Sequence, residues 1–396
     1  MLLALASSAS ARPFEWTPKP PIFAPPAADT LVAIAAGAEH TCVLRHDGGV
    51  LCWGNNDSGQ LGLANSPRCG TFYCATQPTR VTTDVNGQPF TASRLSAGHH
   101  HSCALDARGS AFCWGFNIDS QTGVPSLLQV WQPTPVAHGH NFIDISAGTR
   151  ATCAVEPNAT WCWGAAGDIT GTGVTTLHPL PIPNSGRHQA VATGFEHVCV
   201  QTDVYGFNEI NCHGKNTWGQ TSNDPVSFPT LPTLFGSTFG RPVGPPSTRV
   251  QFTCADRRSD GTVVCAGDNT DGWLGDGSSK ASFTPVVAGG PGMKLSGVTA
   301  GWTHACAINP DHRAFCWGNG HHGQLGNGST LAKWTPEPVA GDIEFHALAA
   351  GQMHTCGIGT DNQIYCWGAN HRGQLGVGDH RGWAWKPMLV LPVRQD

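Results

Sequence analysis

The chain has 396 residues, of which 50 are glycine, 29 are proline and only 12% are charged. So much glycine and proline argues against a helical protein, and a formal net charge of -5 excludes the basic footprint of a nucleic-acid-binding protein. No apolar run approaches the roughly 18 residues that a membrane-spanning helix needs. The sequence therefore predicts neither a nucleic-acid partner nor a membrane span.

The N-terminus has a pattern that is typical of the end of a signal peptide. A short apolar run and an Ala-Ser-Ala triplet fill residues 1–11, so we expect cleavage near Ala11, although the usual basic n-region is missing. Residues 12–29 then read as a proline-rich spacer. We expect residues 30–396 to form one domain.

Seven copies of one phrase follow, spaced by about 50 residues. The phrase is Gly-x-x-His-x-Cys, a turn, and then Cys-Trp-Gly. Ala151 and Phe252 replace the histidine in copies three and five. Each copy reads as short apolar strands around an Asp-Gly type of turn. Self-similarity at this period is typical of a repeat architecture.

Each copy carries two cysteines, one on each arm of its hairpin. Cys356 and Cys366 are equally far from Asp361, so the hairpin places them opposite each other, with an expected Cα separation of about 4.5–5.5 Å. Zinc sites more often show Cys-x-x-Cys knuckles, so disulfides are favoured. The predicted pairs are Cys42–Cys52, Cys103–Cys113, Cys153–Cys162, Cys199–Cys212, Cys254–Cys265, Cys306–Cys316 and Cys356–Cys366, with Cys69–Cys74 in one insertion.

Eight disulfides and a signal-like N-terminus predict an oxidising compartment. We expect a bacterial protein that is secreted, periplasmic or exposed at the cell surface.

The phrase resembles the repeat of the RCC1 family, most specifically where "NNDSGQLG", "NGHHGQLG" and "NHRGQLG" follow Cys-Trp-Gly. It also resembles the related bacterial β-lactamase inhibitor protein II. The resemblance covers about residues 30–393 and implies an all-β fold, a seven-bladed β-propeller in which each blade is a small antiparallel sheet. The cysteines depart from the intracellular family members. We expect the final "KPMLVLPV" to pair beside the first "LVAIAAG" strand and so close the ring.

One rim of such a ring is predicted to bind a partner. The Gly-x-x step and the loop after Cys-Trp-Gly both lie opposite the Asp-Gly turns, and the x-x residues differ in every copy while their flanks repeat. In the resembling inhibitor the corresponding loops grip a protein. The predicted aromatic anchors are Phe116, Phe195, Trp218 and Trp302. The other predicted rim residues are Glu39, Asn56, His99, His100, Arg150, Glu196, His321, His322, Met353, His371 and Arg372.

The histidines divide into two groups. Those at the repeat position suggest a scaffold role, a side-chain hydrogen bond that fixes the adjoining loop; they are His40, His101, His197, His304 and His354. The less regular His99, His100, His321 and His322 leave open a metal site on the rim. No nucleophile elbow, phosphate loop or marked pair of carboxylates predicts catalysis, and no motif predicts a cofactor.

The sequence therefore predicts a monomeric, non-catalytic module that binds a protein. Two alternatives stay open: a glycan ligand stacked on tryptophan and histidine, and a lyase or hydrolase site at the funnel mouth. Nucleotide exchange on a GTPase conflicts with the disulfides. Residues 221–250, between copies four and five, could be a lid over the rim or a solvent loop.

Overall fold

The computed structural model describes most of the chain from residue 30 onwards. The described ranges are 30–125, 128–136, 139–166, 169, 175–182, 187–204, 207–221, 233–235, 242–248, 251–257 and 259–392. The predicted signal peptide and spacer lie outside them.

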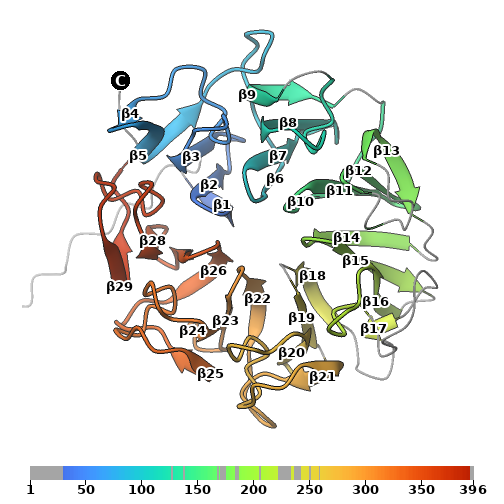
Figure 1. The fold of residues 1–396 in the computed structure, drawn as a ribbon, viewed down its shortest axis with the longest axis vertical. Helices are drawn as coiled ribbons and strands as arrows, with labels where there is room; N and C mark the ends of the chain where they lie inside the picture. Colours follow the sequence, from blue (N-terminus) through green and yellow to red (C-terminus); the bar gives the residue numbers. More distant parts are fainter. Residues whose placement is uncertain are drawn as a thin grey trace, which may run out of the picture.

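Seven antiparallel sheets stand around one axis as the blades of a propeller, which confirms the predicted fold class (Figure 1). Blade one holds β1 (Leu31–Ala36), β2 (His40–Arg45), β3 (Val50–Asn55), β5 (Phe72–Val81) and β4 (Arg68–Cys69). Blade two holds β6 (Arg94–Ala97), β7 (His101–Leu105), β8 (Ala111–Phe116) and β9 (Gln129–Pro135). Blade three holds β10 (Asp144–Ala147), β11 (Ala151–Glu156), β12 (Ala159–Gly164) and β13 (Thr176–Ile182). Blade four holds β14 (Arg187–Thr193), β15 (His197–Val204), β16 (Phe207–Gly214) and β17 (Thr233–Phe235).

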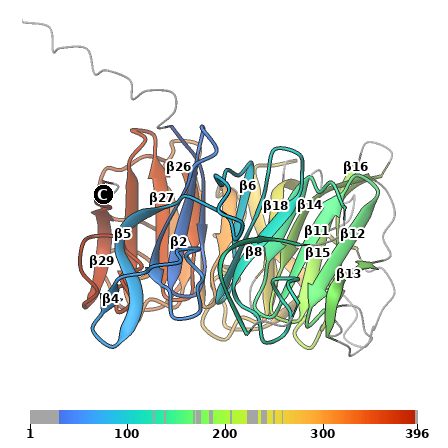
Figure 2. The ribbon, with the colours of Figure 1, turned by 90° about the horizontal axis from the view of Figure 1, so that it is seen from above.

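The last three blades repeat this order. Blade five holds β18 (Pro242–Thr248), β19 (Phe252–Arg257), β20 (Thr262–Gly267) and β21 (Ser282–Val287). Blade six holds β22 (Ser296–Ala300), β23 (His304–Ile308), β24 (Ala314–Gly318) and β25 (Lys333–Pro338). Blade seven holds β26 (Phe345–Ala350), β27 (His354–Gly359), β28 (Ile364–Ala369) and β29 (Trp383–Leu389). The first strand of each blade lies nearest the axis (Figure 1), and in an edge-on view the strands run roughly along it (Figure 2). The connecting loops therefore form two opposite faces.

The cysteines of each hairpin face each other, as the turn geometry predicted. Cys42 pairs in register with Cys52, and the same register holds in the other six blades. The Cα atoms of these seven disulfides lie 4.0–4.2 Å apart, slightly closer than expected. Cys69 and Cys74 form the eighth bridge. Eight disulfides indicate an oxidising environment outside the cytoplasm.

The tryptophans of Cys-Trp-Gly pack between blades. Trp53, Trp114, Trp163, Trp317 and Trp367 are all fully buried. The Trp53 Nε1–H donates to the carbonyl of Gln374 in the loop of blade seven, at 2.9 Å. Trp367 repeats this bond with Gln324 of blade six, also at 2.9 Å. The Gln-Leu-Gly loop of one blade thus accepts a hydrogen bond from the core indole of the next.

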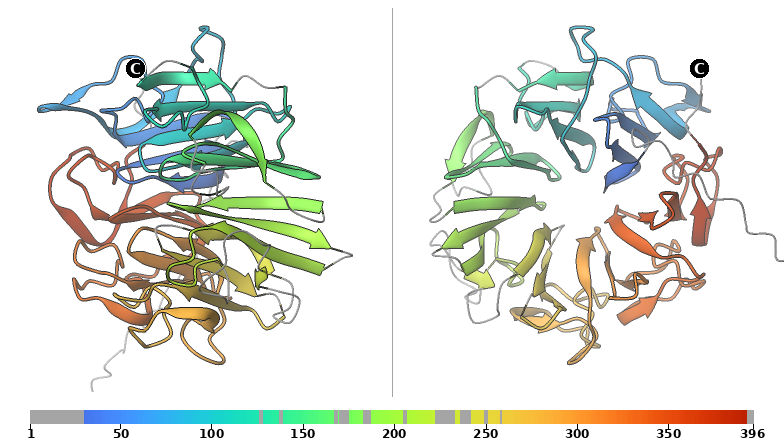
Figure 3. Two further views of the ribbon diagram at one scale, coloured as in Figure 1. Left: turned by 45° about the vertical axis from the view of Figure 1, so that its right-hand side comes forward. Right: turned by 180° about the vertical axis from the view of Figure 1, so that it is seen from behind.

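The expectation of ring closure by a shared strand is wrong. The terminal strand β29 pairs with β28 and completes blade seven, while among the described strands β1 pairs only with β2. The first and last blades lie side by side (Figure 3, right) and share one apolar cluster that includes Trp53, Leu375 and Val390. The backbone N–H of Gly378 also donates to the carbonyl of Thr76, at 2.9 Å. Side-chain packing and loop contacts therefore close the ring.

The segment between copies four and five contributes strands to two blades. Its described parts are β17, the outer strand of blade four, and β18, the innermost strand of blade five. These parts form neither a lid nor a solvent loop; the remainder of 221–250, apart from Thr221, lies outside the described residues. None of the described residues forms a helix that could cross a bilayer.

Candidate functional site

Both predicted sets of loops lie on one face of the ring, which is called the rim below. The residue after Cys-Trp-Gly donates its backbone N–H to the carbonyl of the x-x pair in its own blade. Asn55 bonds Glu39 in this way at 2.8 Å, and Phe116 bonds His100 at 2.8 Å. This contact recurs in all seven blades, so the rim predicted from hairpin geometry is confirmed.

The repeat-position histidines join neighbouring blades. His304 Nε2 lies 2.7 Å from the Thr355 hydroxyl of blade seven, and that hydroxyl donates to the Gln324 carbonyl at 2.9 Å. Because the hydroxyl proton is committed to the carbonyl, the histidine donates from Nε2. The other pairs of this kind are His40–Ser102, His101–Thr152, His197–Thr253 and His354–Thr41. These contacts give the five histidines the scaffold role that their spacing suggested.

The glycine of Gly-x-x-His makes room for this histidine. A Cβ atom on Gly301 would lie 2.7 Å from the His304 ring. Glycine is therefore needed at this step because the imidazole occupies the space that a side chain would take.

Asn56 does not belong to the exposed rim. It is fully buried, its Oδ1 accepts the Leu61 backbone N–H at 2.8 Å, and its Nδ2 donates to the Ser66 hydroxyl at 2.7 Å. Asn370 makes the equivalent loop bond to Leu375 at 3.1 Å. This asparagine builds its loop, so we remove it from the binding surface.

Half-buried rings gather over the axis at the centre of the rim. His99 of blade two stacks on Trp302 of blade six, with centroids 4.3 Å apart, although these blades are not neighbours. His100 lies 3.9 Å from His99 and 6.3 Å from Phe116, between ring centroids. We call these four residues the rim centre. Each of them was predicted from the sequence, but the contact across the ring was not.

Ion pairs surround the rim centre. Glu39 contacts His371 at 2.8 Å, Arg150 contacts Asp119 at 2.6 Å, and Lys215 contacts Glu196 at 2.7 Å. The sequence analysis missed Asp119 and Lys215. Only the folded structure shows that they pair with the rim residues Arg150 and Glu196.

Glu39 is held as a carboxylate. Burial alone would raise its pKa, but hydrogen bonds from His371 and Asn55 and the charges of His371 and Arg372 outweigh burial and hold the pKa at about 2. Glu39 is thus a fixed negative charge next to the rim centre at neutral pH.

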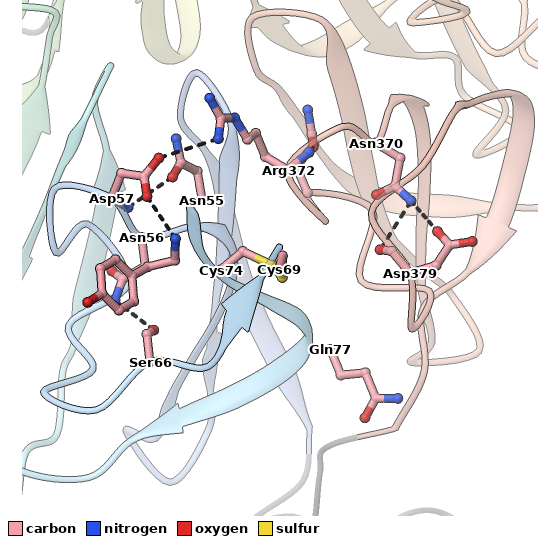
Figure 4. The surroundings of a disulfide bond; sticks show 12 residues. Asn55, Asn56, Asp57, Ser66, Cys69, Cys74, Gln77, Asn370, Arg372 and Asp379 are labelled. Carbon is pink, nitrogen blue, oxygen red and sulfur yellow. Dashed lines mark hydrogen bonds and ion pairs between the residues drawn. A yellow bond between two sulfur atoms is a disulfide. The ribbon is translucent and has the colours of Figure 1, made fainter. Parts of the chain in front are cut away.

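The Cys69–Cys74 insertion supports this part of the rim (Figure 4). The Arg372 guanidinium lies over the Phe72 ring at 4.3 Å and contacts the Asp57 carboxylate at 3.3 Å. The Tyr73 N–H donates to the same carboxylate at 2.7 Å. The stapled hairpin therefore holds Arg372 at the seam between blades seven and one.

The remaining predicted rim residues are placed as follows. Trp218 is 38% exposed, Phe195 and Met353 are half-buried, and His321 is exposed. His322 lies against Trp383 of β29, at 6.2 Å between ring centroids, and not with His99 and His100. No group of three histidines, cysteines, aspartates or glutamates able to hold a metal ion occurs among the described residues.

A channel of about 290 Å³ runs along the innermost strands. Its walls are mainly alanine, serine, threonine and aliphatic residues, and Asp144 is the one titratable side chain among the described residues that line it. Burial raises the pKa of Asp144 to about 6, while its carboxylate accepts the Val191 N–H at 3.0 Å. This carboxyl joins blades three and four.

Comparisons with known proteins point to one family. Two family models, both described as the Regulator of chromosome condensation (RCC1) repeat, together match over half of the chain. One matches residues 31–60, 93–121, 296–324 and 345–374, and the other matches 47–105, 108–155 and 311–358. The ultraviolet-B receptor UVR8 of Arabidopsis thaliana is 26% identical over 325 residues, which are 78% of this chain and 70% of the receptor.

Solved structures have the same fold. Human WBSCR16 matches with a TM-score of 0.73 at 20% identity, over 87% of this chain and 94% of that chain. Prp20p of Saccharomyces cerevisiae matches with a TM-score of 0.71 at 19% identity, over 83% of this chain and 82% of that chain. At these identities the likeness is one of fold.

Proposed function

Since the chain belongs to the RCC1-repeat family, we propose that it is a non-catalytic binding module that engages a protein partner through the rim. The observation that carries this proposal is the rim centre with its surrounding ion pairs. Protein interfaces concentrate their binding energy in a few central aromatic or arginine side chains inside a polar border. Trp302 and Phe116 would be the anchors, and Arg150, Glu196 and His371 would belong to the border.

The relatives favour a protein as the partner. The structure of Prp20p was described together with its binding properties to Gsp1p and histones, and UVR8 is a receptor. The disulfides favour a partner outside the cytoplasm, so we propose that this chain is secreted, periplasmic or at the cell surface. The likeness to β-lactamase inhibitor protein II stays a prediction.

A capture experiment tests the proposal. Tagged wild-type protein and a Phe116→Ala/Trp302→Ala double variant would be incubated with secreted and cell-surface fractions of the source organism. We expect the wild type to retain a protein that the variant loses by about tenfold or more, because truncating a central anchor costs more than about 1–2 kcal/mol.

Val85→Ala provides the matched control. Val85 is 51% exposed and lies on the face of the ring opposite the rim. It follows the end of β5, where Val81 pairs with Val50 next to the Asp-Gly turn of blade one. The Val85→Ala variant should capture as much of the partner protein as the wild type does. Equal capture by the double variant, with its melting temperature unchanged, would overturn the rim as the binding surface.

A further inference from the structure

On the outer strand of each of the last three blades, an aromatic residue directly follows the residue that pairs with the glycine of Cys-Trp-Gly, or of Cys-Ala-Gly in blade five. These residues are Phe283, Trp334 and Trp385. Each lies against a glycine in the rim loop of the preceding blade. A Cβ atom on Gly272 would lie 2.8 Å from Trp334 Cγ, and one on Gly323 would lie 2.7 Å from Trp385 Cδ1. The glycines therefore make room for the rings.

The two indoles have one covered side and one open side. Trp334 and Trp385 each pack on their glycine yet remain 48% exposed. Their backbones are fixed by the same preceding loops, because Gly277 N–H donates to the Trp334 carbonyl at 2.8 Å and Gly328 N–H donates to the Trp385 carbonyl at 2.9 Å. Each indole is thus held in advance of any ligand.

Trp383 extends this surface. It lies two residues before Trp385 on β29, it is 57% exposed, and its ring lies 6.2 Å from that of His322, next to the Gly323 that Trp385 covers. We call Trp334, Trp383 and Trp385 the aromatic shoulder. It lies at the rim end of blades six and seven, since Trp383 pairs in register with Ala369, next to Cys-Trp-Gly.

Packing does not require indoles at these positions. In blade one the equivalent place over Gly373 is filled by Thr76, whose Cγ2 would lie 3.2 Å from a Cβ on that glycine. A threonine therefore satisfies the same loop contact in the same fold. Exposed tryptophan where threonine suffices points to a ligand.

We propose that the aromatic shoulder binds a β-1,4-linked polysaccharide, as a site separate from the rim centre. Pyranose rings joined by equatorial bonds present flat C–H faces that stack on an indole. Asn327 and Ser329 border Gly328, whose N–H bonds the Trp385 carbonyl, and Lys386 follows Trp385, so polar side chains beside this indole can bond sugar hydroxyls. Platforms that recur from blade to blade suit a ligand that is itself a linear repeat, whereas a protein surface has no such period.

The test compares wild type with a Trp334→Thr/Trp385→Thr variant, which copies the arrangement at Thr76. Cellohexaose and chitohexaose would be titrated by calorimetry, and depletion onto insoluble cellulose and chitin would be measured. We expect the wild type to bind at least one hexasaccharide, and the variant to bind it about tenfold or more weakly, because two stacking surfaces are lost.

Val85→Thr is the control, because Val85 is 51% exposed at the face opposite the rim, and this variant should bind sugar as the wild type does. Circular dichroism and thermal melting would establish that each variant folds. Absence of binding to all four probes by folded wild type, or equal binding by the double variant, would overturn the proposal. Loss of protein capture in that variant would also overturn it, since it would assign the shoulder to a protein partner.

Discussion

The buried repeat-position histidines determine how the ring responds to acid. Burial lowers the pKa of His197 to about 4 and that of His304 to about 3. The Nδ1 atoms of both rings have no hydrogen-bond partner among the described residues, so protonation would create a buried donor without an acceptor. A histidine whose pKa is lowered by folding stabilises the protein above its unfolded pKa of about 6.5, and this stability is lost as pH falls toward the folded pKa.

The first prediction concerns His304→Gln, which keeps an N–H donor for Thr355 but does not titrate. The free energy of unfolding of the wild type should fall between pH 7 and pH 4. In the variant that fall should be smaller by about 2–3 kcal/mol, because one protonation event is removed. Denaturant titrations at pH 7, 5.5 and 4 would measure it, and parallel curves for the two proteins would contradict the role given to His304.

At the scale of the element, the hairpin is the unit that the sequence describes best. Equal spacing of the cysteines about each turn predicted the register, and the repeat predicted seven such units. The sequence could not predict the partners of the loop asparagine. Asn56 looked like a variable rim residue, but its side chain closes its own loop, because a polar loop that is buried must satisfy its backbone groups internally.

The second prediction concerns the hairpin disulfide of blade seven. Replacing Cys356 and Cys366 by serine should lower the free energy of unfolding by about 2–3 kcal/mol, since the closed loop of about ten residues gains freedom in the unfolded chain. Chemical denaturation under oxidising conditions would measure this loss. The Cys69–Cys74 disulfide closes a shorter loop, so replacing these two cysteines by serine should lower the free energy of unfolding by less. A larger loss at Cys69 and Cys74 than at Cys356 and Cys366 would contradict this dependence on loop length.

At the scale of the whole molecule, the sequence predicted the ring but not its closure. The final strand carries the composition of an edge strand, and composition does not say which neighbour it joins. In the structure it completes its own blade, and the seam is closed by the shared core around Trp53, by the His354–Thr41 contact and by Arg372 between Asp57 and Phe72. These contacts join residues 300 or more positions apart, for which one sequence contains no signal.

The same limit applies to the binding surface. Most rim residues could be predicted, because the two residues after the glycine of Gly-x-x-His differ between copies while the residues around them repeat. This pattern can be recognised within each blade separately. The stacking of His99 on Trp302 joins blades two and six and depends on the diameter of the ring. The aromatic shoulder was missed for a related reason. Trp334 and Trp385 pack on glycines of the preceding blade, and this contact between blades is visible only in the folded ring.

The central claim is that the rim centre contacts the partner. The most direct measurement is photo-crosslinking with benzoylphenylalanine placed at position 116 or at position 85, in separate proteins incubated with secreted and cell-surface fractions. The account predicts a discrete crosslinked protein from position 116 and none from position 85. A product from position 85 alone, or the same product from both positions, would contradict it.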